Sequence, residues 1–436
     1  MRRLRNLLEV VTAFLAAAVA CLSVMMPVDF ARVSGSSALH QYLMVVNVPR
    51  ADTAGAVSAV VAVVMAVSFG DTRLTWIAAS VTGVALLANF LLSRAFDTDV
   101  SLATANYIDS IFGGVLLGLV GAAVLRRWVP GAAFMLGAIA SVVFGDLTEL
   151  PSTDSTYTGL GSDSPPLWSI VAVVVLILVS TRWHRRRRVE VVLDRDAPFG
   201  SVVAAAIISG STLLAAEWFA GHKVGVFPAT LAVLATVLIA VLSAFILTGR
   251  DGSIVLIGVA FAAASSAIVA VPLPNWVLPI LFLAVAAGLW TGDRWRYPLA
   301  AIGLVGALAI FAALAPDSDG RQWVPVIGAL ALAAIAGFGF GAAPPRLIQN
   351  RVVGIAVLFV PSVVLAIRGA NDSLVGYSRL WYRSPGAEHE PFAGWTALAI
   401  TLGCALGLLW LRAVRPAVPG RMDSARAQRD SREEDQ

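Results

Sequence analysis

Residues 182–198 read R-W-H-R-R-R-R-V-E-V-V-L-D-R-D-A-P and form the densest charge cluster in a chain that otherwise runs from one apolar block to the next. Five of the first seven residues in this stretch are arginines. Arginines are costly in hydrocarbon, and loops rich in them tend to stay on the cytoplasmic side of a membrane. The stretch therefore predicts a cytoplasmic boundary that orients the apolar blocks on both sides of it.

The composition is that of a membrane protein. Of the 436 residues, 58% are hydrophobic and 13% are charged, whereas a soluble domain carries about 25% charged residues. The formal net charge is +4, but the arginines gather at the ends of apolar runs, which indicates membrane topology rather than nucleic-acid binding. We expect a multi-pass protein of the plasma (inner) membrane, surrounded by the lipid bilayer, without a nucleic-acid partner.

The apolar blocks predict the number of membrane crossings. A crossing needs about 20 apolar residues, and two of the blocks, 130–145 and 276–291, are short. The predicted fold is therefore an all-α polytopic transmembrane helical bundle with about 12–14 spans. The candidate spans are 7–27, 53–70, 74–95, 106–125, 130–145, 167–182, 199–219, 228–248, 253–271, 276–291, 297–315, 324–343, 351–368 and 392–412.

The distribution of charge supports this threading. Arginines follow the even-numbered spans, and acidic residues are concentrated in the other loops, as expected when positive loops stay inside. Both termini are thus predicted to be cytoplasmic. The arginines on the predicted cytoplasmic side include Arg73, Arg126, Arg127, Arg250, Arg294, Arg296, Arg346, Arg351, Arg412 and Arg415, whereas Arg32, Arg50, Arg379 and Arg383 are exceptions in longer outer loops.

The basic stretch divides the chain into parts. We expect an N-terminal membrane half over 1–182 with about six spans, a basic cytoplasmic linker over 183–198, and a C-terminal membrane half over 199–412 with about eight spans. Residues 413–436 are too polar to fold alone and are expected to be a disordered cytoplasmic tail. The outer segment 28–52 is expected to hold a short interfacial helix or strand over 38–48.

Polar groups within or beside the spans are the candidates for a substrate pathway, because such groups usually face a partner or a water-filled cavity. Asn106 and Asp109 are three residues apart and face the same way on a helix. The alternative is a solvated helix start with Asn106 as its cap. Arg94 at a span end also fits snorkelling, Asn89 fits a hydrogen bond between helices, and Glu217 fits an ordinary outer turn.

Small residues and prolines indicate how the helices pack. The pairs Gly114-x-x-x-Gly118 and Gly403-x-x-x-Gly407 predict a close approach of helix backbones. Pro361 predicts a kink inside the span at 351–368. Such patterns describe packing and do not identify a substrate.

Signatures of soluble enzymes and of metal sites are missing from the sequence. It contains no Walker A motif, no G-x-S-x-G and no H-E-x-x-H, and its four histidines are scattered among loops. Cys21 and Cys404 fall inside apolar runs, where we expect them to act as small buried hydrophobes. We therefore expect no cofactor and no metal.

Short motifs carry several resemblances. Residues 70–73 (G-D-T-R) and 249–252 (G-R-D-G) resemble the signature of major facilitator transporters, which follows span two and recurs after span eight. The span count is similar to that of polysaccharide-exporter flippases. Asp29, just after the first span, resembles the catalytic acid of polyprenyl-phosphate-dependent glycosyltransferases, with Asp52 in place of their second acid. In composition the chain resembles Arg- and Ala-rich integral membrane proteins of actinobacteria.

Three functions follow from these observations. The first is a secondary transporter or lipid/glycolipid flippase of the cell envelope, acting on a lipid-linked or small-molecule substrate, with its pathway lined by Asn89, Arg94, Asn106, Asp109 and Glu217. The second is a membrane glycosyltransferase that uses Asp29. The third is a non-catalytic subunit that binds a partner in a cell-envelope complex. The sequence favours a function that is not enzymatic.

Overall fold

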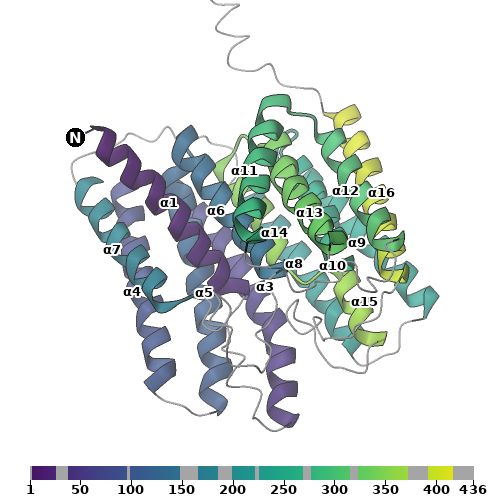
Figure 1. Cartoon of the computed structure of the whole chain (residues 1–436), viewed down its shortest axis with the longest axis horizontal. Helices are drawn as coiled ribbons and strands as arrows, with labels where there is room; N and C mark the ends of the chain where they lie inside the picture. The colour runs from purple at the N-terminus through teal and green to yellow at the C-terminus, as the bar shows by residue number, and fades with distance from the viewer. Residues whose placement is uncertain are drawn as a thin grey trace, which may run out of the picture.

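The chain folds into a bundle of α-helices (Figure 1). The computed structural model describes residues 2–25, 38–95, 99–147, 165–184, 199–220, 225–268, 276–314, 323–371 and 391–415, and every regular element in these ranges is helical. The predicted all-α bundle is therefore confirmed. In chain order the helices are α1 (Arg2–Met25), α3 (Ala38–Phe69), α4 (Thr72–Ala95), α5 (Asp99–Val124), α6 (Trp128–Leu147), α7 (Leu167–His184), α8 (Phe199–Ala220), α9 (Val226–Ile246), α10 (Ser253–Ala267), α11 (Val277–Trp295), α12 (Pro298–Leu314), α13 (Trp323–Ala342), α14 (Ile348–Phe359), α15 (Val363–Asn371) and α16 (Pro391–Val414).

The helices have the length and apolarity that a bilayer requires. In the part of the chain that the structure describes, nine helical segments are long and apolar enough to cross a membrane, and five shorter apolar helices lie among them. Each predicted span coincides with one helix, except that 351–368 is divided between α14 and α15. The protein is thus a multi-pass membrane protein.

The structure corrects the predicted start of the second span. The sequence predicts a separate interfacial element over 38–48, but α3 begins at Ala38 and continues to Phe69 as one helix. Pro49 inside this helix removes one backbone hydrogen bond. The hydroxyl of Thr53 donates to the Pro49 carbonyl oxygen (2.7 Å), and the helix continues through the proline.

The helices up to α7, which we call the first set, pack in a definite order. Within this set α3 packs on α5, α1 on α6 and α4 on α7, and α5 also packs on both α1 and α4. When the spans of this set are numbered along the chain, the second packs on the fourth, the first on the fifth, and the third on the sixth.

The same order recurs in the helices from α10 to α16, which we call the second set, with α14 and α15 counted as one span. Here α11 packs on α13, α10 on α14, and α12 on α16. The contacts between the sets are also reciprocal, because α3 packs on α14 while α11 packs on α6. The second span of each set therefore meets the fifth span of the other, as a two-fold relation between the sets would produce.

Glycines allow a close approach of the helices in the equivalent pairs α3–α5 and α11–α13. A Cβ atom added to Gly114 of α5 would overlap the carbonyl oxygen of Gly55, and one added to Gly118 would overlap that of Ala59. In the second set, a Cβ atom at Gly337 of α13 would overlap the carbonyl oxygen of Val285. The close approach predicted for Gly114 and Gly118 is confirmed.

The helices α8 and α9 belong to neither pairing pattern. α8 packs on α3, α9 and α15, and α9 packs on α16. A small apolar cluster that includes Phe219 of α8, Ala229 of α9 and Ile367 of α15 holds them to the second set. They form an added pair at the edge of the two sets.

The turns predicted to be cytoplasmic meet at one end of the bundle. Arg127, which precedes α6, forms an ion pair with Glu9 of α1. The indole Nε1 of Trp128 donates a hydrogen bond to Asp293 at the end of α11 (3.3 Å). We call this end the arginine-rich face and the other end the opposite face; arginines that bond to other segments at the arginine-rich face are Arg127, Arg250, Arg351 and Arg415.

Candidate functional site

Two of the predicted pathway residues contact each other directly. Asn89, late in α4, donates from Nδ2 to Oδ1 of Asp109 in α5 (2.8 Å) and to the carbonyl oxygen of Ala105 (2.9 Å). A carboxyl group inside a span is costly unless it has a partner or faces water. Its partner here is a neutral amide, so the pair forms a polar contact between α4 and α5 towards the opposite face.

The neighbouring candidates lie on the same two helices. Asn106 is on the turn of α5 before Asp109, and it is buried. Arg94 belongs to the last turn of α4, but its side chain lies outside the described part of the structure. The structure therefore brings Asn89, Asn106 and Asp109 to one region of the α4–α5 contact.

Glu217 belongs to a different contact. Its Oε1 lies 2.7 Å from Nε of Arg50, so the pair joins α8 to α3. The two side chains are 46% (Arg50) and 40% (Glu217) exposed, and an ion pair at such a position contributes about 0–1 kcal/mol. Asp29, the residue of the glycosyltransferase hypothesis, lies outside the described residues.

A buried polar network at the arginine-rich face was not predicted. Asp251, between α9 and α10, accepts hydrogen bonds from the backbone N–H groups of Arg346 (2.9 Å) and Leu347 (3.1 Å). It also accepts one from Nδ2 of Asn350 (2.9 Å), whose Oδ1 accepts from the hydroxyl of Ser201 (2.6 Å). A carboxylate is favourable beside the start of a helix, where backbone N–H groups are unpaired. In the sequence, the only sign of this network was the pair of amide side chains, Gln349 and Asn350, shortly before an apolar run.

The span at 351–368 is broken inside the protein, which confirms the kink predicted at Pro361. α14 ends at Phe359, Val360 is extended (φ −72°, ψ 135°), and α15 begins at Val363. The hydroxyl of Ser362 accepts the backbone N–H of Leu365 (3.2 Å), as an N-cap does. Irregular backbone is tolerated at membrane depth only where protein or a cavity surrounds it, and 94% of this span is buried.

A small cavity adjoins the break. Its volume is about 20 Å³ and its wall includes Pro361 and Ser362, with Thr212 from α8 and Thr236 from α9. Both threonine hydroxyls donate to carbonyl oxygens of their own helices (2.9 and 2.8 Å), so their oxygen atoms can still accept. The cavity has room for about one water molecule. The arrangement thus offers three hydroxyl groups in a mainly aliphatic wall.

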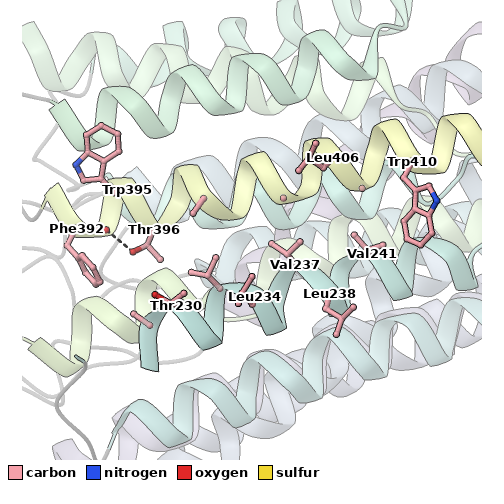
Figure 2. A pocket seen from close by; sticks show the side chains of 15 residues that line it. Thr230, Leu234, Val237, Leu238, Val241, Phe392, Trp395, Thr396, Leu406 and Trp410 are labelled. Atoms are coloured by element: carbon pink, nitrogen blue, oxygen red, sulfur yellow. Dashed lines mark hydrogen bonds between the residues drawn. The ribbon is translucent and has the colours of Figure 1, made fainter. Parts of the chain in front are cut away.

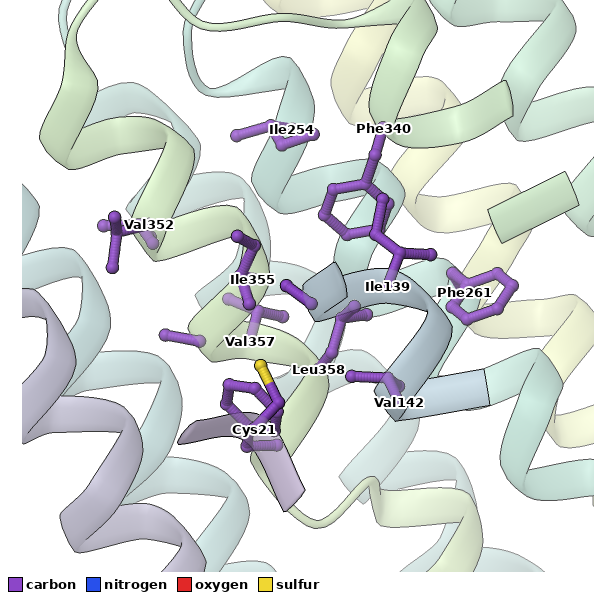
Figure 3. Packing of buried hydrophobic residues seen from close by; sticks show 14 of the residues in the cluster. Cys21, Ile139, Val142, Ile254, Phe261, Phe340, Val352, Ile355, Val357 and Leu358 are labelled. Carbon is purple, nitrogen blue, oxygen red and sulfur yellow. The ribbon is translucent and has the colours of Figure 1, made fainter. Parts of the chain in front are cut away.

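The two sets are closed against each other around α14. Figure 3 shows Cys21 of α1 and Val142 of α6 beside Leu358 of α14, within one continuous hydrophobic cluster. Nearer the arginine-rich face, a Cβ atom built on Gly121 of α5 would lie 3.1 Å from Cγ2 of Val352. The contact between the sets is therefore apolar and tightly packed at these positions.

The described residues show no metal centre of the usual kind. Nowhere in these ranges do three His, Cys, Asp or Glu side chains come together as metal ligands would, and Cys21 and Cys404 are both buried. Comparison of the chain with protein-family models and with curated proteins finds no match. A functional assignment therefore rests on the geometry of the two helix sets and the broken span between them.

Proposed function

We propose that this protein is a secondary transporter that works by alternating access between the first and second sets. One observation carries the proposal: the two sets share one order of helix pairing and meet through reciprocal contacts. Many transporters consist of two such repeats, with the substrate site near the middle of the membrane where the repeats meet. A fixed scaffold has no need of this arrangement.

The repeats proposed here differ from the halves expected from the basic stretch. The first set covers 2–184, as the sequence suggests, but the second covers 253–415 rather than 199–412. The reason is that α8 and α9 take no part in the pairing that the sets share. We assign them as an added pair between two six-span repeats.

The turn after the second span of each set supports the resemblance to major facilitator transporters. In the first set this turn is G-D-T-R at 70–73, where Asp71 accepts the backbone N–H of Arg73 (2.8 Å). In the second set the similar sequence G-D-R-W-R at 292–296 forms the last turn of α11 and its C-cap, where Asp293 accepts from the Arg296 guanidinium (3.2 Å). The segment 249–252, matched from the sequence, instead joins α9 to α10.

The proposal gives the broken span a role. It is the fifth span of the second set, it contacts α3, α5 and α6 of the first set, and its break adjoins a cavity too small for any substrate larger than water. We assign this broken span as the element at which the closed contact opens during transport. Asn89, Asn106 and Asp109 are proposed to line the route from the opposite face.

Accessibility of a buried residue between the sets tests this assignment. Val352 is fully buried, but alternating access would expose it to water from the arginine-rich face. In a variant without Cys21 and Cys404, a cysteine at position 352 (Val352→Cys) is expected to react with a charged thiol reagent added to inside-out vesicles. Mass spectrometry of the intact protein measures the rate of modification.

The matched control is Val305→Cys, because Val305 is equally buried and its helix, α12, packs mainly on α10, α13 and α16 of the second set. It is expected to stay unmodified over the same time. Equal rates at the two positions would indicate general loosening of the bundle. No reaction at either position would favour a rigid envelope subunit over a transporter.

A further inference from the structure

An apolar groove runs along the outside of the bundle between α9 and α16. It has a volume of about 780 Å³, and its walls include Leu234 and Leu238 of α9 and Leu406 of α16. Figure 2 shows Trp395 near one end of the groove and Trp410 near the other. These two tryptophans are separated by a rise of about 22 Å along α16, which exceeds half of the roughly 30 Å hydrocarbon thickness.

Glycines on α16 shape the floor of this groove. A Cβ atom at Gly403 would lie 2.5 Å from Cγ2 of Val237, and one at Gly407 would lie 2.5 Å from Cγ2 of Val241. The two helices therefore touch through small residues, while the larger leucines stand on either side. Only 28% of the α9 span is buried, so the groove opens towards the surroundings of the protein.

The lining selects an apolar ligand. The two threonines in the groove, Thr230 and Thr396, donate their hydroxyl hydrogens to Val226 (2.8 Å) and Phe392 (2.7 Å) of their own helices. They therefore offer no donor to a polar ligand. Aliphatic side chains between two tryptophans match the acyl chain of a lipid.

The end of the groove at the arginine-rich face is positively charged. Trp410 packs against Phe245, with the ring centroids 4.6 Å apart. The Arg415 guanidinium lies over the ring of Phe245, 5.4 Å from its centroid. Arg415 donates to the carbonyl oxygen of Gly249 (2.7 Å), and Arg250 donates in return to that of Arg415 (2.9 Å).

These two arginines bond to helix ends but not to acids. Among the described residues, neither Arg250 nor Arg415 forms an ion pair with a carboxylate. Within the same ranges, Nη1 of Arg250 and Nε of Arg415 donate no hydrogen bond and remain available. Two cations beside an apolar groove complement the anionic phosphate of a lipid whose chain enters the groove.

We propose that this groove is a binding site for an anionic phospholipid. Its phosphate binds Arg250 and Arg415, and one acyl chain lies along α9 and α16 from Trp410 towards Trp395. The phosphate stabilises the contact between the C-terminal ends of α9 and α16, because it neutralises the positive charges of Arg250 and Arg415. This site is separate from the contact between the two sets and does not depend on the proposed transport activity.

Native mass spectrometry tests the proposal on the full chain after reconstitution in vesicles of equal phosphatidylglycerol and phosphatidylcholine. One phosphatidylglycerol is expected to remain bound in preference to phosphatidylcholine. Arg415→Gln should lower its retention about fivefold, because one arginine beside an anionic lipid supplies about that factor. Leu406→Trp fills the groove without changing charge and should also lower retention of phosphatidylglycerol. This second variant keeps the proposal testable if Arg415→Gln misfolds.

Two controls complete the test. Arg73→Gln removes a cation from another turn of the arginine-rich face, and Leu283→Trp enlarges an equally exposed leucine outside the groove. Both should retain the lipid. Loss of the lipid in Arg73→Gln to the same degree, or equal retention of the two lipids by the unchanged protein, would overturn the proposal. If the unchanged protein has the mass of a dimer and Leu406→Trp does not, a second copy of the chain occupies the groove instead of a lipid.

Discussion

Replacing Gly114 by alanine is expected to lower the free energy of unfolding by about 3 kcal/mol, since overpacking at a tight contact has this cost. The new methyl group would overlap the carbonyl oxygen of Gly55, so α3 and α5 would have to separate along their whole contact. Gly337→Ala is expected to have the same effect on α11 and α13. The thermal unfolding midpoint of the purified protein in detergent measures both effects.

Gly303→Ala is the matched control for these two variants. Gly303 is also inside an apolar helix, α12, but an added Cβ atom meets no other atom within 4 Å. Its replacement should leave the midpoint unchanged or raise it, because alanine favours helix by about 1 kcal/mol over glycine. If all three variants unfold at the same temperature, the close helix contacts described here are wrong.

Asp251→Ala is expected to destabilise the protein by about 3 kcal/mol, since hydrogen bonds to a buried charged acceptor are worth about 1.5–3 kcal/mol each. The change leaves the backbone N–H groups of Arg346 and Leu347 and the amide of Asn350 without this acceptor. The loss should appear in the thermal unfolding midpoint. Hydrogen exchange should also quicken first at the start of α14, where the N–H groups become free.

The comparison for this variant is Asp71→Ala, at the corresponding type of turn after α3. Asp71 accepts one hydrogen bond from the exposed N–H of Arg73, so its loss should cost less than about 1 kcal/mol. The loss of stability in Asp251→Asn should lie between those of the two alanine variants, because an amide oxygen can still accept from one donor. Equal effects of Asp71→Ala and Asp251→Ala would contradict the capping role of Asp251.

The sequence predicts the spans well because their signals are local. Apolar runs of the right length and arginines at their ends are properties of consecutive residues, and each predicted span coincides with a helix or, at 351–368, with α14 and α15. The predicted start of the second span at residue 53 was wrong, because α3 begins at Ala38 and runs through Pro49 as one helix. The order of helix pairing could not be predicted, because hydropathy contains no information about which spans are neighbours.

The candidate site was predictable only in part for the same reason. Asn89 and Asp109 were identified as unusual polar residues in spans, but their hydrogen bond joins two helices and depends on packing. Asp251 was noticed only as part of a short motif, and its partners are about a hundred residues away along the chain. The kink at Pro361 was visible, whereas the contacts of α14 with α3, α5 and α6 of the first set were not.

The most direct test of the two-set account is a pair of distance measurements by electron paramagnetic resonance. Spin labels at Leu74 and Leu299 report on the starts of α4 and α12 at the arginine-rich face, and labels at Leu92 and Leu314 report on the ends of the same helices at the opposite face. All four side chains are exposed.

In liposomes, the account predicts two populations for each pair of labels. A change of pH or membrane potential should shift them in opposite directions, so that one face opens as the other closes. A single narrow distance at both faces, unchanged under all of these conditions, would contradict alternating access and would show the two sets to be one rigid body.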